Sequence, residues 1–174
     1  MALQQVLDAV RRMESDGIIE RYAIGGAVGA TIYLEPAATF DVDVFVVSAG
    51  EENAKLLTLA PIYEYLRAHG AIIEGAHIKI GDWPVQFLPA ADPLLQEALQ
   101  EAGDVTVDGS PTRIFSAEHL AAIALQTGRA KDKLRVLQFV ESGILNGDRF
   151  ASIISRHGLD AKWALFTTQF LGQR

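Results

Sequence analysis

The sequence contains no cysteine, which excludes disulfide bridges and thiolate-ligated metal sites. It also lacks any apolar run near the roughly 20 residues that a membrane-spanning helix needs, so we expect no membrane contact. The first residues, MALQQVLDAVRRMESDG, do not have the layout of a signal peptide and read instead as an amphipathic helix. These absences together indicate a cytoplasmic protein.

Positive charge is scarce. The 15 Lys and Arg residues face 22 Asp and Glu, for a formal net charge of -7. This balance argues against a general high-affinity nucleic-acid binder, because such affinity comes from neutralising phosphates with Lys and Arg. One dense basic cluster, Arg129, Lys131, Lys133 and Arg135, reads equally well as a solvated helix face. The four histidines are scattered without ligand spacing, so we expect no zinc site.

The composition is that of an ordinary globular protein. The 174 residues are 49% hydrophobic and 21% charged, and the chain is long enough to build its own core. Helical spacing of apolar residues predicts helices, and β-branched runs predict strands. We expect helices over residues 2–14, 27–34, 52–69, 93–101, 116–126, 131–142, 148–157 and 160–171, and strands over 18–24, 40–47, 71–74, 77–80, 85–88 and 112–115. The strands over 71–74 and 77–80 are either a pair or one interrupted strand. Ser116 is expected to cap its helix, and Gly143 to end the helix before it.

The order of these elements predicts two parts. Residues 1–115 form an α/β (α+β) part with a mixed sheet flanked by helices, and residues 116–174 form a C-terminal helical subdomain. No flexible linker separates them, so we expect the subdomain to pack on the core. The last helix carries Trp163, Phe166 and Phe170, which either pack on that core or form a dimer contact. Whether the chain forms a homo-oligomer is therefore left open.

Two aspartates alternate with apolar residues in the strand expected over 40–47. Asp41 and Asp43 are two residues apart, so both side chains point to one face of the sheet. Neighbouring carboxylates repel each other, and a hard divalent cation removes that repulsion. A strand with one solvated face would show the same pattern without any metal.

A glycine pair precedes that strand. Gly25 and Gly26 separate an expected strand from an expected helix, which fits a tight turn. Glycine also lets the backbone approach a ligand closely, and the amides at a helix start favour phosphate. The pair is neither a Walker loop nor a G-x-G-x-x-G fingerprint.

Taken together, I-G-G-A-V followed by F-D-V-D-V-F-V resembles the nucleotidyltransferase superfamily, whose fold is shared with DNA polymerase beta. The stretch W-P-V-Q-F-L-P resembles the strand that carries the third carboxylate of that family, and here the position holds Gln86. A neutral amide offers one carbonyl oxygen to a cation but does not accept a proton as a carboxylate does.

A second likeness covers the helical part. The segment I-F-S-A-E-H-L-A-A-I-A-L-Q-T-G-R-A-K-D-K-L-R resembles small bacterial nucleotidyltransferase-like proteins, a group that includes toxins of toxin–antitoxin systems. In that group a Lys-Asp pair occurs in the helix, and Lys131 and Asp132 match it by position. The resemblance implies that Lys131, Asp132 and Arg129 help to bind the nucleotide.

The resemblance implies transfer of a nucleoside monophosphate from a nucleoside triphosphate to an acceptor hydroxyl, with Asp41, Asp43 and Gln86 holding Mg²⁺ or Mn²⁺ and Gly25 and Gly26 cradling the phosphates. The acceptor stays open between RNA, a protein and a small molecule. Gln86 favours an alternative, a catalytically degenerate member that binds a nucleotide or a partner. A plain interaction protein without a nucleotide is the third reading.

Overall fold

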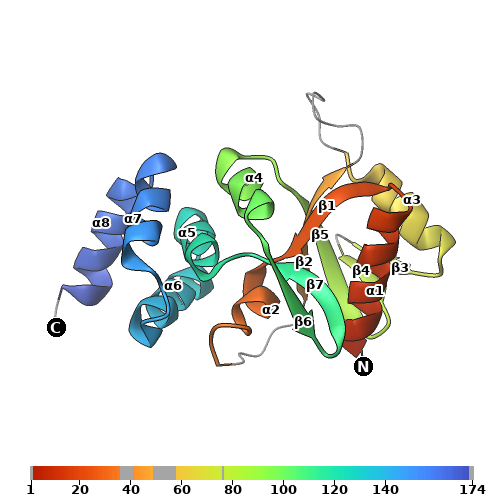
Figure 1. The fold of residues 1–174 in the computed structure, drawn as a ribbon, viewed down its shortest axis with the longest axis horizontal. Helices are drawn as coiled ribbons and strands as arrows, with labels where there is room; N and C mark the ends of the chain where they lie inside the picture. The colour runs from red at the N-terminus through yellow and green to blue at the C-terminus, as the bar shows by residue number, and fades with distance from the viewer. Residues whose placement is uncertain (1, 36–40, 49–57, 76, 173–174) are drawn as a thin grey trace. The chain divides into compact units, whose positions relative to one another are not determined.

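The computed structural model describes residues 2–35, 41–48, 58–75 and 77–172 (Figure 1). These residues divide into two compact units. The first takes in the described residues of Met1–Gly29 and Ala37–Phe115, and the second those of Ala30–Pro36 and Ser116–Arg174. Among the described helices, none has the length and apolarity to cross a membrane.

A seven-stranded mixed sheet forms the centre of the first unit. Its strands are β1 (Ile19–Ile24), β2 (Val42–Ser48), β3 (Ile72–Glu74), β4 (His77–Ile80), β5 (Trp83–Pro89), β6 (Gly103–Val107) and β7 (Ser110–Ile114). They lie in the order β3-β4-β5-β2-β1-β7-β6 (Figure 1). Strand β2 pairs in parallel with β5 and antiparallel with β1, and β1 pairs in parallel with β7. Three hairpin-type pairs, β3–β4, β4–β5 and β6–β7, are antiparallel.

Helices α1 (Ala2–Ser15) and α4 (Pro93–Gln100) pack on this sheet, α1 against β1, β5 and β7 and α4 against β1 and β2. The apolar side chains that α1 repeats at helical spacing are buried: Val6, Leu7, Val10 and Met13. The Arg21 guanidinium on β1 donates hydrogen bonds to the carbonyl oxygens of Leu99, at 2.8 Å, and Gln100, at 3.1 Å. Burial of apolar area and this tie to the end of α4 fix the helices on the sheet.

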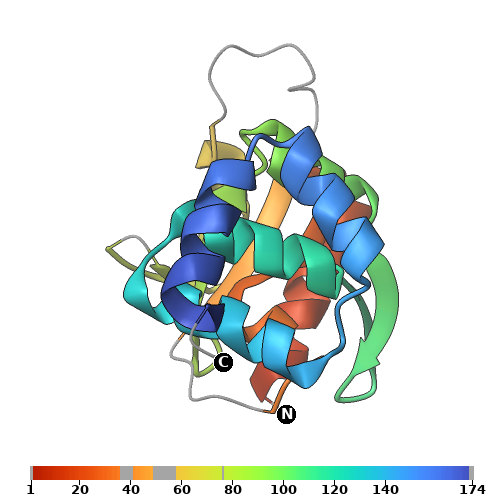
Figure 2. The same ribbon diagram turned by 90° about the vertical axis from the view of Figure 1, so that its left-hand side faces the viewer.

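The second unit is helical. It contains α5 (Ala117–Thr127), α6 (Ala130–Ser142), α7 (Gly147–Arg156) and α8 (Asp160–Phe166), which continues into the π-helix η1 (Thr167–Leu171). Helix α5 contacts the other three α-helices (Figure 2). The Ser116 side chain caps α5 by accepting from the His119 amide, and Gly143, at φ +68°, ends α6, both as the sequence predicts.

Two helix predictions were too long. Helix α2 (Gly26–Ala30) replaces the helix expected over 27–34, because the chain turns at Thr31–Tyr33. Helix α3 (Ala60–Ala68) replaces the one expected over 52–69 and begins beside Pro61. Proline is tolerated in the first turn of a helix but not in its interior, where it removes a hydrogen bond. The expected residues 52–57 and Phe40 lie outside the described residues.

Strand β6 was missed. It pairs with β7 as an outer strand of the described sheet, and none of its five residues is buried. A strand without a buried face carries no hydrophobic signal. The available signal was Asp108-Gly109, a dipeptide that favours a two-residue hairpin turn. Both residues have positive φ here, 49° and 80°.

Residues 72–74 and 77–80 form two separate strands and not one interrupted strand. The expected strands over 71–74 and 77–80 are present as β3 and β4, paired from Ile72↔Lys79 to Glu74↔His77. The fold class is as expected, a mixed sheet flanked by helices and followed by helices. That the helical subdomain packs on the core stays a prediction.

Candidate active site

Gly25 and Gly26 form a turn that contacts Asp43. The Gly25 amide donates to the Asp43 carbonyl oxygen at 3.0 Å, and the Gly29 amide donates to the Gly25 carbonyl oxygen at 2.8 Å. Gly26 has φ +57°, a conformation that L side chains rarely adopt. A Cβ on Gly26 would lie 1.9 Å from Asp43 Oδ2. The turn therefore brings backbone and carboxylate together in a way that another residue at 26 would prevent.

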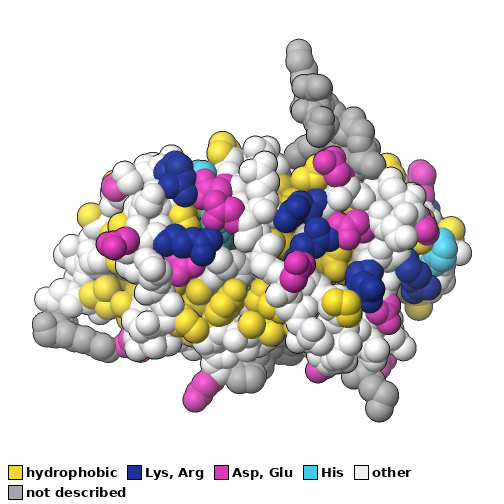
Figure 3. All heavy atoms as spheres, in the orientation of Figure 1, with side chains coloured by type: hydrophobic (Ala, Val, Ile, Leu, Met, Phe, Trp, Pro, Cys, Tyr) yellow, Lys and Arg dark blue, Asp and Glu magenta, His cyan; other side chains and the backbone are white. Residues whose placement is uncertain are grey.

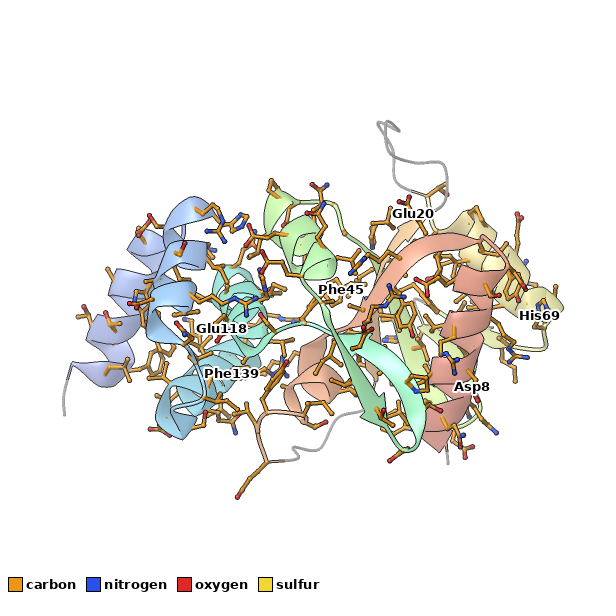
Figure 4. All side chains as sticks on the ribbon, in the orientation of Figure 1. Asp8, Glu20, Phe45, His69, Glu118 and Phe139 are labelled. Atoms are coloured by element: carbon orange, nitrogen blue, oxygen red, sulfur yellow. The ribbon has the colours of Figure 1, made fainter. Side chains whose placement is uncertain are left out.

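Gly25 is restricted for a different reason. A Cβ there would lie 2.5 Å from Cε2 of Phe45, whose ring, labelled in Figure 4, packs against Phe115 with centroids 4.9 Å apart. Gly25 thus fits the apolar packing beneath the turn, and Gly26 fits the carboxylate. Glycine is needed at these two positions for different physical reasons, which the sequence alone did not distinguish.

The two aspartates lie where alternation predicts. Val42 and Val44 are buried, whereas Asp41 and Asp43 are partly exposed. Asp43 lies in β2, and Asp41 precedes the strand by one residue. The carboxylates are thus presented on the side of the strand opposite to the buried valines.

Gln86 lies next to Asp43. The parallel ladder of β2 and β5 pairs Asp43 with Gln86, so their side chains project from the same face of the sheet. Gln86 is partly exposed, between the buried Val85 and Phe87. The strand expected over residues 85–88 is therefore present, as part of β5, and the position that the resemblance assigns to a third carboxylate holds an amide.

A histidine that the sequence did not single out lies at this site. His77 Nε2 is 3.7 Å from Asp41 Oδ2. Antiparallel pairing of Ile78 with Val85 places His77 level with Gln86 on the neighbouring strand. The sequence feature that could have indicated His77 is the β4–β5 hairpin, because the register of that hairpin places His77 beside Gln86.

The donor set at this face suits a divalent cation. Asp41 and Asp43 supply carboxylate oxygens, and Gln86 supplies an amide oxygen beside Asp43. Hard cations such as Mg²⁺ bind such oxygens. The Asp43 carboxylate lies against Gly26 and that of Asp41 against His77, so the face offers ligands from both ends of the D-V-D triplet.

The basic cluster belongs to the second unit. Asp132 is only 2% exposed and accepts a 2.6 Å hydrogen bond from Arg129 Nε, and Arg135 Nη1 lies 3.7 Å from its other oxygen. Lys131 and Lys133 are exposed, as a solvated helix face predicts. Asp132 therefore anchors two arginines of its own helix region, and a role of Lys131, Asp132 and Arg129 at the nucleotide stays a prediction.

Another buried carboxylate organises the helices of this unit. Glu118, labelled in Figure 4, accepts a hydrogen bond from the Asn146 backbone amide at 2.9 Å and lies 3.6 Å from Arg149 Nη1. Burial raises the pKa of the Tyr33 phenol, and the negative charge of Glu118 adds to the rise while Arg149 opposes it. These contacts stabilise the arrangement of helices within the second unit.

No protein-family model and no curated protein sequence matches this chain. Solved structures with a similar fold do match it. An antigenic nucleotidyltransferase-like protein from Paracoccidioides brasiliensis superposes with a TM-score of 0.56 at 13% identity, covering 89% of this chain and 86% of that one. The solution structure of the antibiotic-resistance factor ANT(2'')-Ia gives 0.54 at 16%, covering 97% and 98%.

A crystal structure of ANT(2'')-Ia in complex with adenylyl-2''-tobramycin gives a TM-score of 0.46 at 17% identity, covering 97% of this chain and 96% of that one. At such identities the first two likenesses establish the fold alone. The chain has a nucleotidyltransferase-like fold, as its Gly-Gly and D-V-D motifs led us to expect.

Proposed function

We propose that this chain binds a metal–nucleoside triphosphate complex at the face that carries Asp41 and Asp43, and transfers the nucleoside monophosphate to an acceptor hydroxyl. The observation that supports this most is the fit of Gly26 to Asp43. A glycine with positive φ, whose missing Cβ leaves room for the Asp43 carboxylate, holds a tight turn beside the D-V-D strand. A generic strand-to-helix turn has no need of that close approach.

The residues have separate tasks in this proposal. Asp41 and Asp43 would hold Mg²⁺ or Mn²⁺, with Gln86 as a neutral oxygen donor. When bound, the metal stabilises negative charge on the entering and leaving oxygens. In this proposal the phosphates approach the backbone of the Gly25–Gly26 turn, while the space that a side chain would need at these two positions is filled by Phe45 and Asp43.

The transfer itself is a substitution at the α-phosphorus. A bond forms between the acceptor oxygen and that phosphorus, the bond to pyrophosphate breaks, and pyrophosphate leaves with the electron pair. The acceptor proton goes to a carboxylate or to water, because the neutral Gln86 amide does not accept it.

Gln86 supports a second function. A chain that keeps the glycine turn and two carboxylates but lacks a third can bind a nucleotide without transferring it. In that case the face serves as a nucleotide- or partner-binding module. The two functions share the binding step and differ only in catalysis.

The charge distribution bears on the acceptor. On the face that Figure 3 shows, Lys and Arg side chains lie among Asp and Glu rather than in a continuous basic patch. With a net charge of -7, this favours a protein or small-molecule acceptor over a long nucleic acid.

The binding step can be tested without knowing the acceptor. Calorimetric titration of ATP, CTP, GTP and UTP with Mg²⁺ into wild type, Asp43→Asn and Asp104→Asn measures it directly. Asp104 is an exposed carboxylate on β6, so its substitution changes the net charge equally. We expect metal-dependent binding in wild type and Asp104→Asn and its loss in Asp43→Asn. Folded wild type that binds no nucleotide would refute the proposal.

A further inference from the structure

The contact between Asp41 and His77 is not that of a hydrogen bond. Their atoms Oδ2 and Nε2 are 3.7 Å apart, whereas N–H···O bonds have separations of roughly 2.7–3.2 Å. Two ligands of one metal ion, each about 2.0–2.2 Å from it, lie about 2.8–3.1 Å apart in octahedral geometry and about 3.3–3.6 Å apart in tetrahedral geometry. The observed separation is that of an ion pair and lies just above the tetrahedral range, so a small movement would let the two donors share an ion.

The position of His77 in the sheet supports this. Gln86 is paired with Asp43 on one side and lies level with His77 on the other. The three side chains thus form a row across β2, β5 and β4, on one face. His77 and Asp41 are also open to solvent, with 39% and 33% of their side-chain areas exposed, so an ion can reach them.

The chemistry of the donors indicates what the ion is. Imidazole nitrogen is the commonest side-chain ligand of first-row transition ions, whereas Mg²⁺ prefers an all-oxygen site. Where the third carboxylate is replaced by an amide, the site has lost a hard anionic ligand. A neighbouring imidazole shifts its preference away from Mg²⁺.

We infer that His77 is a ligand of the metal ion that Asp41 binds, and that it makes this site select a divalent first-row transition ion over Mg²⁺. The inference rests on the proposed function, because it concerns the same cation. It assigns a ligand that the motif does not contain.

Mn²⁺ is a suitable probe, since its electron paramagnetic resonance signal reports both binding and nitrogen ligation. Free Mn²⁺ would be measured during titration of wild type, His77→Ala, His77→Gln and Asp41→Asn, with the full chain in each case. His69→Ala is the matched control, because His69 is an exposed histidine of the same unit, stacked on Tyr65. Mg²⁺ affinity would be measured by competition with Mn²⁺.

We expect His77→Ala and His77→Gln to weaken Mn²⁺ binding by about tenfold or more, because losing even an outer-shell partner of a metal ligand costs about 10–100-fold in affinity, and to change Mg²⁺ binding by less than about twofold. Pulsed resonance spectra should show nitrogen coupling in wild type and His69→Ala and none in the His77 variants. Asp41→Asn should weaken both ions.

Two results would overturn the inference, and they separate it from the proposed function. Unchanged Mn²⁺ affinity and nitrogen coupling in folded His77 variants, with nucleotide binding still dependent on Asp43, would remove His77 as a ligand and leave the proposed function standing. Wild type that binds neither Mn²⁺ nor nucleotide would remove both. The Gln variant keeps the comparison valid if Ala at 77 prevents folding.

Discussion

Asp43 occupies the space that a side chain at Gly26 would need. Its Oδ2 lies 1.9 Å from the position of a Cβ on Gly26, and the Gly25 amide donates to its carbonyl oxygen at 3.0 Å. The conformation of the turn and the position of the Asp43 carboxylate therefore depend on each other, so a substitution at Gly26 should displace Asp43.

We expect Gly26→Ala to reduce both stability and nucleotide binding. The positive φ of an L residue costs about 1–2 kcal/mol, and the clash with Asp43 adds roughly 1–3 kcal/mol. Gly17→Ala is the matched control, because Gly17 has φ +72° but no atom within 4 Å of its Cβ position. Urea unfolding should show the larger loss at position 26. Equal losses in the two variants would show that the contact with Asp43 costs nothing.

Restoring a third carboxylate should strengthen metal binding. We expect Gln86→Asp to raise Mg²⁺ affinity about tenfold, because Asp43 lies directly beside residue 86 and affinity rises with ligand charge. Without metal the new repulsion should lower stability by up to about 1 kcal/mol. Gln86→Asn is the control, since it has the length of Asp without its charge.

The same variant separates the two proposed functions. A gain of transferase activity in Gln86→Asp would indicate a degenerate site that the substitution repairs. A loss of activity, with metal affinity unchanged, would show that Gln86 is a working residue of this chain and contradict our expectation.

Asp132 should matter for stability. It is buried between Arg129 and Arg135, so Asp132→Asn removes charge-assisted hydrogen bonding and should cost about 2 kcal/mol. Asp148→Asn is the control, because Asp148 is an exposed carboxylate in the first turn of α7, as Asp132 is in that of α6. Nucleotide binding lost at unchanged stability would instead support the direct role that the Lys-Asp match implied.

The raised pKa of Tyr33 predicts a pH effect. In the folded chain burial and Glu118 raise the pKa above the ordinary value of 10.0, so the folded state keeps a proton that the unfolded state has lost. Stability should therefore be unaffected by this group below pH 10 and should fall as the pH rises through the raised value. Tyr33→Phe should show a shallower decline in denaturant titrations, with tyrosinate absorbance as the direct readout. An equal decline of stability with pH in wild type and Tyr33→Phe would contradict this prediction.

Much of the fold was readable from the sequence, because its signals are local. The helical spacing of Val6, Val10 and Met13 fixed α1, and Ser116 and Gly143 fixed the ends of two helices. Strand β6 was not readable, since its residues are not buried and its partner β7 decides its place. Helix α3 begins only at Ala60, because Pro61 fits the first turn of a helix and not its interior.

That Asp41 and Asp43 share a face follows from their spacing alone, because side chains alternate along any extended strand. The sequence also placed glycines where a tight turn was needed. Folding, in contrast, sets the contact of Gly26 with the Asp43 carboxylate, the pairing of Gln86 with Asp43, and the 3.7 Å separation of His77 from Asp41. These relationships join strands distant in sequence, and their register is set by ladder pairing and packing, which no local pattern of residues encodes.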